Sequence, residues 1–223
     1  MIWSPKSAIV ALIGRPLANR LASPFHRWLA RRRTISLLQS LPSSGTLVNI
    51  GCGYRPLSGW VNLDLVPGQA DMIWDIRDGL PFRDQTIEAI FCEHVIEHLT
   101  AADGMLFIKE CRRVLQCGGV LRLSTPDARK YLFSYVYEDE FLKQHRFGDG
   151  SRLPIDLINQ MMRENGHHLW VYDVLSLTRL LREAGFQNVQ VMESGSSKSS
   201  KMEGIDSKER EFESLYMEAI REY

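Results

Sequence analysis

The residues best suited to ligand chemistry lie between positions 47 and 64, which read LVNIGCGYRPLSGWVNLD. A short apolar run ends at Gly51-Cys52-Gly53, and glycine brings backbone close to a ligand because it has no Cβ. A second apolar run ends on Asp64, and a carboxylate at a strand end can accept hydrogen bonds from both hydroxyls of a ribose. This pattern predicts a nucleoside-binding corner between two strands.

A dinucleotide site of the nicotinamide type is disfavoured by the spacing. Its fingerprint needs a third glycine and an acid about 20 residues further on. Residues 54–58 contain no glycine, and Asp64 follows Gly53 by eleven positions (64 − 53), which leaves little room for a full helix. Because a lone G-x-G also occurs in ordinary strand-to-helix turns, the prediction depends on what the other strands carry.

Polar residues also follow three later apolar runs, at Asp75, at Glu93-His94 and at Thr125-Pro126-Asp127. Apolar runs of strand length alternate with segments of helical spacing, which predicts an α/β fold with a single doubly wound, mostly parallel sheet. Ligands bind such sheets outside the carboxyl ends of the strands. We therefore expect these residues along one edge, together with Gly51-Cys52-Gly53 and Asp64.

The expected helices carry recognisable start and stop signals. Thr100 and Asp103 have capping-box spacing, and Gly118-Gly119 is expected to end the helix that they begin. Apolar residues from Phe212 to Ile220 recur at helical spacing, although residues 214–219 are also long enough for a final strand. The other expected strands are residues 47–50, 60–63, 72–74, 87–92, 120–123 and 189–191, and further helices begin at Pro154 and Asp173.

The sequence indicates a basic arm followed by a main domain. Residues 1–41 form the arm, with one or two short helices that carry an apolar face, and residues 42–223 form the domain. Residues 128–170 interrupt the alternation with many aromatic side chains, and we expect an insert that is either a lid over the substrate or a packed helical excursion. Residues 194–208 are rich in serine and lysine, which predicts a mobile loop.

The formal net charge is zero, but positions 1–63 contain no acidic residue. Such a basic segment can meet nucleic acid, an anionic membrane surface or an acidic face of its own protein, and we prefer the last. It also fits an organellar transit peptide, although Pro5, Pro16 and Pro24 interrupt any long amphipathic helix. The basic residues of this segment are Lys6, Arg15, Arg20, Arg27, Arg31, Arg32, Arg33 and Arg55.

The sequence predicts a cytoplasmic protein without a transmembrane segment. The longest apolar run near the start, residues 8–13, is far shorter than the ~20 residues that cross a bilayer, and basic residues follow it too closely for a secretory signal. Peripheral contact between the arm and a membrane surface stays open. The four cysteines lack paired metal-site spacing and are expected to be reduced thiols (Cys52, Cys92, Cys111 and Cys117).

Taken together, the motifs resemble those of a class I S-adenosylmethionine-dependent methyltransferase over residues 47–191. The family usually has an acid where Asn49 stands, a proline where Cys117 stands and a full helix before the second strand. These departures are similar to those of a compact bacterial subgroup of methyltransferases with a shortened first helix. Four strings carry the resemblance: NIGCG before Asp64, LPF at residues 80–82, EHVIEHL at residues 93–99, and RVLQCGG at residues 113–119, which leads into VLRLSTPD.

The resemblance implies a Rossmann-like sheet with helices on both faces and an antiparallel last strand, so residues 214–219 are expected as strand against their helical spacing. It also implies S-adenosylmethionine as cofactor. The glycine turn would pass under the methionine part, Asp64 would hold the ribose, Asp75 would face the adenine, and Glu93-His94 would line the methionine end. The expected cofactor-binding residues are Gly51, Cys52, Gly53, Asp64, Leu65, Asp75, Ile76 and Glu93.

Methyl transfer needs modest catalytic machinery, because the sulfonium is already a strong electrophile and the protein mainly aligns a nucleophile with it. For an oxygen nucleophile, a positioned base helps. His94 is the first candidate, because histidine titrates near neutral pH and this one follows a strand end. His168 and His145 in the insert are the next candidates, and Asp127 either acts as a base or caps a turn. Each of them, taken singly, is also compatible with a structural role.

The expected function is methyl transfer to a small-molecule acceptor, which the subgroup suggests is a sugar or a glycan precursor. The alternative is a non-catalytic binding module of the same fold that acts through the basic arm. A nucleic-acid substrate is not favoured, because few aromatic residues are interleaved with the basic ones. The string from His94 to His98 matches the H-x-x-E-H zinc motif, but it starts at a strand end, so no metal site is expected. The oligomeric state is left open.

Overall fold

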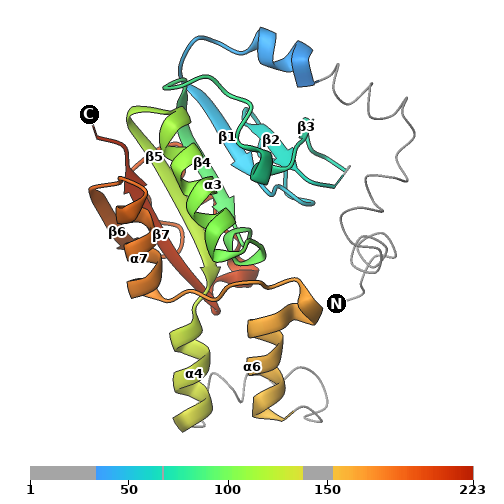
Figure 1. The fold of residues 1–223 in the computed structure, drawn as a ribbon, viewed down its shortest axis with the longest axis vertical. Helices are drawn as coiled ribbons and strands as arrows, with labels where there is room; N and C mark the ends of the chain where they lie inside the picture. The colour runs from blue at the N-terminus through green and yellow to red at the C-terminus, as the bar shows by residue number, and fades with distance from the viewer. Residues whose placement is uncertain (1–33, 67, 138–152, 223) are drawn as a thin grey trace. The chain divides into compact units, whose positions relative to one another are not determined.

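The computed structural model describes residues 34–66, 68–137 and 153–222 (Figure 1). The chain forms two units, residues 1–41 and 42–223. Of the first unit only residues 34–41 are described, and residues 34–40 are helical, so most of the predicted basic arm lies outside the described residues. The second unit carries the sheet and every residue of the candidate site.

The second unit is built on one seven-stranded sheet with the order β3-β2-β1-β4-β5-β7-β6 (Figure 1). The pairs from β3 to β5 are parallel, whereas β7 runs antiparallel to both β5 and β6. The predicted mostly parallel α/β sheet with an antiparallel last strand is confirmed. The strands are β1 (Thr46–Ile50), β2 (Val61–Asp64), β3 (Met72–Ile73), β4 (Ile87–Glu93), β5 (Leu115–Pro126), β6 (Asn188–Met192) and β7 (Ser214–Ile220).

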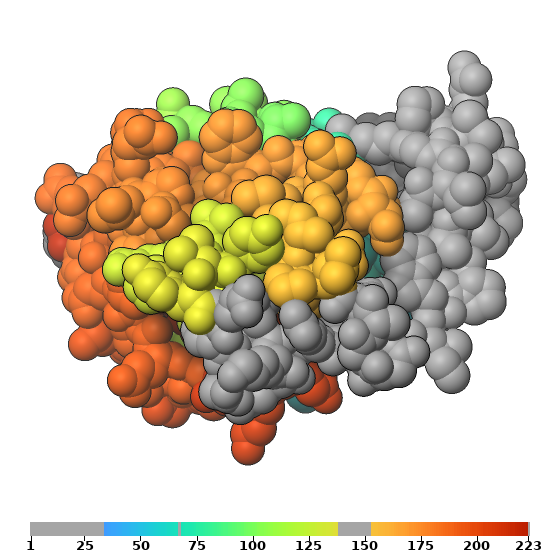
Figure 2. Space-filling view, turned by 90° about the horizontal axis from the view of Figure 1, so that it is seen from below, coloured from blue at the N-terminus to red at the C-terminus, as the bar shows by residue number. Residues whose placement is uncertain are grey.

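The helices form two groups. Helices α3 and α7 contact each other and the sheet, whereas α4 and α6 pack side by side beyond the carboxyl ends of the parallel strands (Figures 1 and 2). No helix in the described part of the chain is long and apolar enough to cross a membrane. The α-helices are α3 (Ala101–Val114), α4 (Ala128–Tyr137), α6 (Pro154–Arg163) and α7 (Val174–Glu183), and the 3-10 helices are η1 (Ile76–Asp78), η2 (Ile96–His98), η3 (Glu164–Gly166) and η4 (Lys208–Arg210).

Loops cover the face of the sheet opposite α3. Cys92 lies on the α3 side, near Cys111, so Phe91 beside it points the other way, because strand residues alternate between faces. Among the described residues, loop residues 51–60 and 194–208 lie on this face, because the short connection between β1 and β2 holds no helix. The buried cluster on this face is Ala89, Phe91, Val120 and Met202, with Leu47, Leu57, Trp60, Ile205 and Ile220 against it.

Helix α3 begins as predicted and ends earlier than predicted. The Thr100 side chain accepts a hydrogen bond from the Asp103 backbone N–H, which caps the first turn. The expected end at Gly118-Gly119 was wrong, because the helix ends at Val114 and the glycines lie within β5. A Cβ at Gly119 would lie 3.1 Å from the Ile87 carbonyl oxygen, so this glycine permits close contact between β5 and β4.

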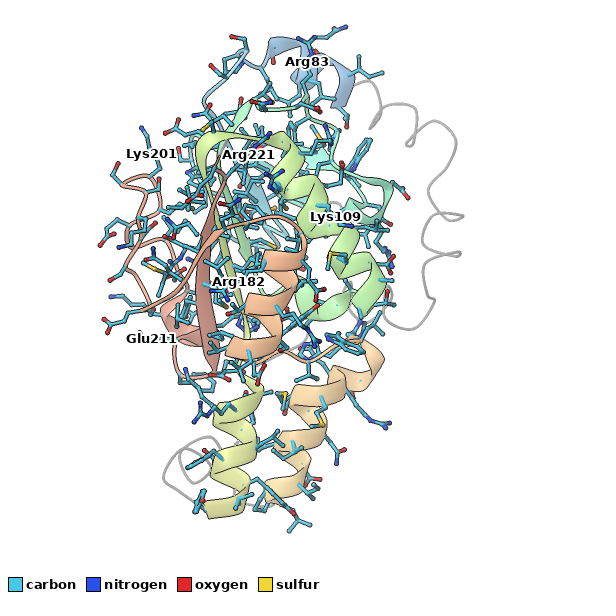
Figure 3. The ribbon with its side chains drawn as sticks, turned by 60° about the vertical axis from the view of Figure 1, so that its left-hand side comes forward. Arg83, Lys109, Arg182, Lys201, Glu211 and Arg221 are labelled. Carbon is cyan, nitrogen blue, oxygen red and sulfur yellow. The ribbon has the colours of Figure 1, made fainter. Side chains whose placement is uncertain are left out.

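The last segment is a strand. The family resemblance predicted this strand, whereas the spacing of the apolar residues in the segment favoured a helix. β7 pairs with β5 from Val120↔Ile220 to Pro126↔Ser214, and its residues from Ser214 to Ala219 are buried. Arg221 follows the strand and donates to the carbonyl oxygens of Arg112 and Arg113 at 2.9 Å each, and to that of Leu115 (Figure 3). The end of the sheet is therefore fastened to the end of α3.

Residues 194–208 were predicted to be a mobile loop, but they are held by the fully buried side chain of Arg122. Its Nε donates to Asp206 Oδ1 at 2.8 Å, and its Nη1 donates to Glu218 Oε1 at 2.9 Å and to the Ser196 carbonyl at 2.8 Å. A buried guanidinium must keep its charge and hydrogen bonds paired. The loop is thus anchored to the core, with Met202, Asp206 and Ser207 buried, which composition alone did not reveal.

Candidate functional site

The glycine turn and Asp64 form one fixed unit at the ends of β1 and β2. The backbone N–H groups of Gly51 and Cys52 donate to the Leu63 carbonyl at 2.8 and 3.1 Å. Asp64 accepts from the N–H of Gly53 through Oδ2 and from the N–H of Val66 through Oδ1, both at 2.8 Å. Each carboxylate oxygen has more than one acceptor site, so Asp64 can still accept hydrogen bonds from a ligand.

The two glycines of the turn have different surroundings. Both have positive φ, +72° at Gly51 and +50° at Gly53, a conformation that favours glycine. A Cβ on Gly51 would lie 2.2 Å from Val95 Cγ2, so this glycine is required by packing. No described atom lies within 4 Å of a Cβ placed on Gly53, so that side of the turn is open to a ligand.

Cys52 lies between them as a buried thiol. Burial, together with the charges of Asp64 and Asp71, raises the pKa of Cys52 to about 11. A thiol with such a pKa is protonated at neutral pH and is a poor nucleophile. The structure therefore agrees with the prediction that Cys52 fills a small space in the turn.

The surface beside Asp64 is apolar. Leu65 follows Asp64 and is 42% exposed, and Ile73, the register partner of Asp64 on β3, is 38% exposed. Further along, Asp75 caps η1 by accepting from the Arg77 N–H at 3.1 Å, and its carboxylate binds the Arg77 guanidinium at 2.9 and 3.1 Å. Ile76, within η1, is half-buried. A flat apolar ring placed here would contact the apolar side chains and would have the polar groups of Asp75 and Arg77 at its edge.

Glu93 connects the glycine loop to the C-terminal loop. Its Oε2 accepts from Arg55 Nη1 at 2.8 Å, and its Oε1 accepts from the Ser207 backbone N–H at 2.9 Å. The same arginine donates to the Ile205 carbonyl at 3.1 Å. No residue spacing signals this connection, because its members lie far apart along the chain.

His94 is buried and both of its ring nitrogens have partners. Its Nε2 lies 2.6 Å from Ser214 Oγ, and its Nδ1 lies 3.0 Å from Arg210 Nη1. The Ser214 hydroxyl donates to the Arg210 carbonyl, and a guanidinium can only donate. These two contacts place the proton on Nε2 and the lone pair on Nδ1, whereas Glu97 Oε1, 3.2 Å from Nδ1, would accept from a doubly protonated ring. Its backbone has φ of +51°, and its N–H donates to the Ser124 carbonyl at 2.9 Å.

The segment at residues 167–170 lies against η2. The backbone N–H groups of Leu169 and Trp170 donate to the Glu97 carbonyl at 2.8 and 3.2 Å. This brings His168 beside His98, with ring centroids 5.0 Å apart in an edge-on arrangement. Burial lowers the pKa of His168, but Glu164 at 3.1 Å and the Met161 carbonyl outweigh burial and raise it above its ordinary value.

Asp127 caps α4 rather than lying beside Asp64. Its carboxylate accepts from the Arg129 N–H at 2.9 Å, and its own N–H donates to the Glu213 carbonyl at 2.9 Å. It borders a cavity of about 420 Å³ with Lys130, Glu211 and other residues, none of them from the glycine turn.

The structure thus brings the predicted residues together in two neighbouring groups. One group contains the glycine turn, Asp64 and Asp75, and the other contains Glu93, His94 and His168. The Gly51–Val95 contact and the Arg55–Glu93 ion pair join them. The metallopeptidase arrangement of the H-x-x-E-H string is not formed, because η2 is a single 3-10 turn and His94 lies outside it.

Comparison with known proteins gives matches in sequence. A family model described as a methyltransferase domain matches residues 24–191. A Mycolicibacterium smegmatis protein named probable S-adenosylmethionine-dependent methyltransferase is 32% identical over 117 residues. That alignment covers 51% of this chain and 35% of the relative, so most of the relative lies outside it.

Solved structures show the same fold at low sequence identity. An S-adenosylmethionine-dependent methyltransferase from Archaeoglobus fulgidus is 14% identical with a TM-score of 0.50, covering 87% of this chain and 94% of its own. The YcgJ protein from Bacillus subtilis is 11% identical with a TM-score of 0.51, covering 86% and 99%. At these identities the likeness concerns the fold alone.

Proposed function

Because the chain belongs to the class I S-adenosylmethionine-dependent methyltransferases, as the family match over residues 24–191 shows, we propose that it transfers a methyl group from this cofactor to a small-molecule acceptor. The observation that supports this most directly is the fixed carboxylate of Asp64 beside an open glycine turn. In an open α/β sheet, that is the place where a nucleoside binds.

The residues at this corner fit S-adenosylmethionine. Asp64 keeps acceptor capacity for the ribose hydroxyls, and the open side of Gly53 leaves room for the methionine part. The exposed apolar surface of Leu65 and the half-buried Ile76, next to Asp75, suit the adenine ring. Gly51 and Cys52 shape the turn beneath, and Glu93 holds the loop over it through Arg55.

The proposed mechanism relies mainly on alignment. Bound S-adenosylmethionine supplies a methyl group already activated by the sulfonium. The chain then has to hold an acceptor oxygen in line and receive its proton. His94, His168 and Asp127 remain the predicted proton acceptors. Of these, His94 presents a lone pair on Nδ1, although Arg210 lies against it at 3.0 Å.

We propose that the methyl acceptor is a sugar or a glycan precursor, the class that the family resemblance suggests. A groove of about 380 Å³ between α4 and α7 has the size of a small-molecule site. On α4, the rings of Phe133 and Tyr137 lie 4.5 Å apart, tilted by 39° to each other, and both are exposed, which offers aromatic surface to a sugar ring. Helices α4 and α6 would act as the lid over this end of the sheet. The cytoplasmic location and the role of the basic arm also stay predictions.

The alternative, a binding module without catalysis, depended partly on Asn49, which stands where the family usually has an acid. In the structure Asn49 Nδ2 donates to the Arg55 carbonyl at 3.2 Å and to Asn62 Oδ1 at 3.0 Å. The residue therefore braces the shortened connection between β1 and β2. This departure has a structural purpose and does not indicate loss of the cofactor site.

The proposal is tested by calorimetric titration of S-adenosylmethionine and S-adenosylhomocysteine. The Asp64→Asn and Asp64→Ala proteins should bind about 10- to 100-fold more weakly than wild type, because hydrogen bonds to a charged group are lost. Asp78→Asn changes an exposed acid of η1 near the site and serves as the matched control. Absence of binding to folded wild type, or equal binding by the Asp64 variants and wild type, would reject the assignment.

A further inference from the structure

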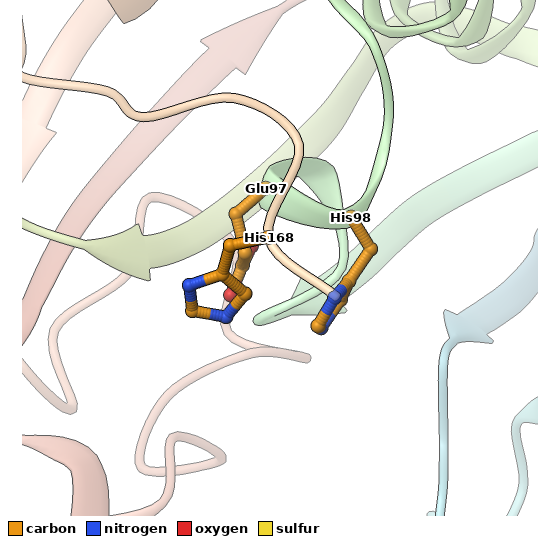
Figure 4. A group of neighbouring side chains, drawn as sticks. All are labelled: Glu97, His98 and His168. Carbon is orange, nitrogen blue, oxygen red and sulfur yellow. The ribbon is translucent and has the colours of Figure 1, made fainter. Parts of the chain in front are cut away.

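Three side chains with metal-ligating atoms converge at the end of β4, outside the residues assigned to the cofactor. Glu97 and His98 come from η2, and His168 comes from the segment that lies against it (Figure 4). One ligating atom from each of them lies within 4.8 Å of the others. The sequence pattern alone did not indicate this group, because His168 lies seventy positions from His98 (168 − 98).

Backbone carbonyls orient both imidazole rings. His98 Nδ1 lies 3.1 Å from the His167 carbonyl oxygen, and His168 Nδ1 lies 2.5 Å from the Met161 carbonyl oxygen. A carbonyl only accepts, so each Nδ1 carries a proton, and His98 Nε2 then keeps its lone pair for a metal ion. His168 Nε2 lies 3.1 Å from Glu164 Oε2 and donates to it, so this nitrogen would release its proton when a metal binds. Metal-binding histidines are commonly oriented in this way by a hydrogen bond from the other ring nitrogen.

Glu97 supplies a buried carboxylate oxygen without a hydrogen bond. The residue is 2% exposed, and its Oε2 accepts from Thr125 Oγ1 at 3.2 Å. Within the described part of the chain, Oε1 accepts no hydrogen bond. His94 Nδ1 lies 3.2 Å away, but its lone pair, not a proton, faces this region in the tautomer assigned above. A buried carboxylate oxygen in this position favours a cation beside it.

We propose that Glu97, His98 and His168 bind one divalent transition-metal ion of the first row, such as Zn²⁺ or Co²⁺. Two imidazoles and one carboxylate suit these ions, whereas Mg²⁺ and Ca²⁺ prefer an all-oxygen set. Ligand bonds of about 2.0–2.2 Å require the three atoms to lie about 3–3.5 Å apart, so the side chains close inward by about an ångström on binding. Three protein ligands leave open positions on the ion.

The neighbouring charges are compatible with a bound cation. Glu164 Oε2 lies 3.1 Å from His168 Nε2 and adds negative charge, and the ion would displace this contact. Arg210 is a neighbouring cation, and its guanidinium is directed at His94 and Glu213. If the proposed function is correct, an open coordination position would bind an acceptor oxygen near the cofactor corner, and His168 would then be a ligand rather than a base.

The test uses full-length protein freed of metal with a chelator and dialysed. Co²⁺ is added, and its visible d–d absorption and the calorimetric stoichiometry are recorded. Wild type should bind one Co²⁺ per chain, with Zn²⁺ competing and Mg²⁺ failing to compete. His98→Gln and His168→Gln should each bind Co²⁺ more than about tenfold more weakly. The control is His167→Gln, which keeps the carbonyl that orients His98 and should bind like wild type.

The outcomes separate this site from the proposed function. No stoichiometric Co²⁺ binding by wild type, or equal binding by His168→Gln and wild type, would overturn the metal site even if S-adenosylmethionine binds. Conversely, one bound Co²⁺ that depends on His98 and His168 would establish the site even if S-adenosylmethionine fails to bind. Circular dichroism confirms that each variant is folded.

Discussion

Gly51 and Gly53 have similar backbone conformations, yet replacing them with alanine should lower the free energy of unfolding by different amounts. A methyl group on Gly51 combines left-handed strain with a clash against Val95, so Gly51→Ala should destabilise the domain by roughly 2–5 kcal/mol. Gly53→Ala adds only backbone strain, about 1–2 kcal/mol. Urea unfolding followed by circular dichroism measures both free energies.

The same pair of variants has an internal control. Val95→Ala in the Gly51→Ala background removes the methyl group that clashes and should recover part of the lost stability. Equal costs at Gly51 and Gly53, or no recovery in the double variant, would contradict the packing explanation. In that case the first glycine would also have to be explained by ligand contact.

Helix α3 and the LPF loop before β4 form one hydrogen-bonded element. Arg113 donates to the carbonyls of Phe82 and Leu80 at 3.0 and 2.9 Å, and Glu110 accepts from the Leu80 N–H at 2.8 Å. Glu110 and Arg113 are themselves paired at 2.7 Å. The LPF string, one of the four that carry the family resemblance, therefore has a structural purpose in this chain, because it connects the helix to the loop.

This element should make stability depend on pH in a defined direction. The hydrogen bond from Arg113 outweighs partial burial and holds the pKa of Glu110 below its ordinary value of 4.5. A lowered folded-state pKa stabilises the protein above the ordinary value, and the contribution is lost as pH falls through the folded-state pKa. Glu110→Gln should therefore lower the free energy of unfolding most at neutral pH, and the loss should become progressively smaller below about pH 4.

Urea unfolding at several pH values measures this difference. Glu183→Gln is the control, because Glu183 and its partner Arg179 are largely exposed and lie 4.0 Å apart. Exposed ion pairs of this kind contribute little to the free energy of unfolding. A cost of Glu110→Gln that stays constant between pH 7 and pH 3 would show that the carboxylate charge is not what ties the helix to the loop.

For the whole molecule, local patterns predicted the order of elements, the parallel sheet and the glycine–acid corner. They succeeded because strand ends and caps such as Thr100 depend on neighbouring residues. They failed where distant segments meet. The end of α3, the cover formed by residues 194–208 and the approach of His168 to Glu97 all depend on contacts between parts of the chain that are far apart in sequence. No period or spacing encodes such contacts.

The Arg122 network is the clearest of these long-range contacts and gives the last prediction. Arg122→Met would leave Asp206 and Glu218 buried without their cation, so it should cost about 3–5 kcal/mol. Adding Asp206→Asn and Glu218→Gln removes the unpaired charges and should recover part of this loss. Arg179→Met, at an exposed pair, should change stability by less than about 1 kcal/mol.

Hydrogen exchange distinguishes a local from a global effect of Arg122→Met. If residues 194–208 are part of the core, their amides should lose protection together with those of β5 and β7, because Arg122 and Glu218 lie on these strands. Loss confined to residues 194–208, with unfolding free energy near that of wild type, would mean that the loop is an independent cover. The buried charge network would then hold only the loop, and the apolar cluster around Phe91 and Met202 would carry the stability of this face.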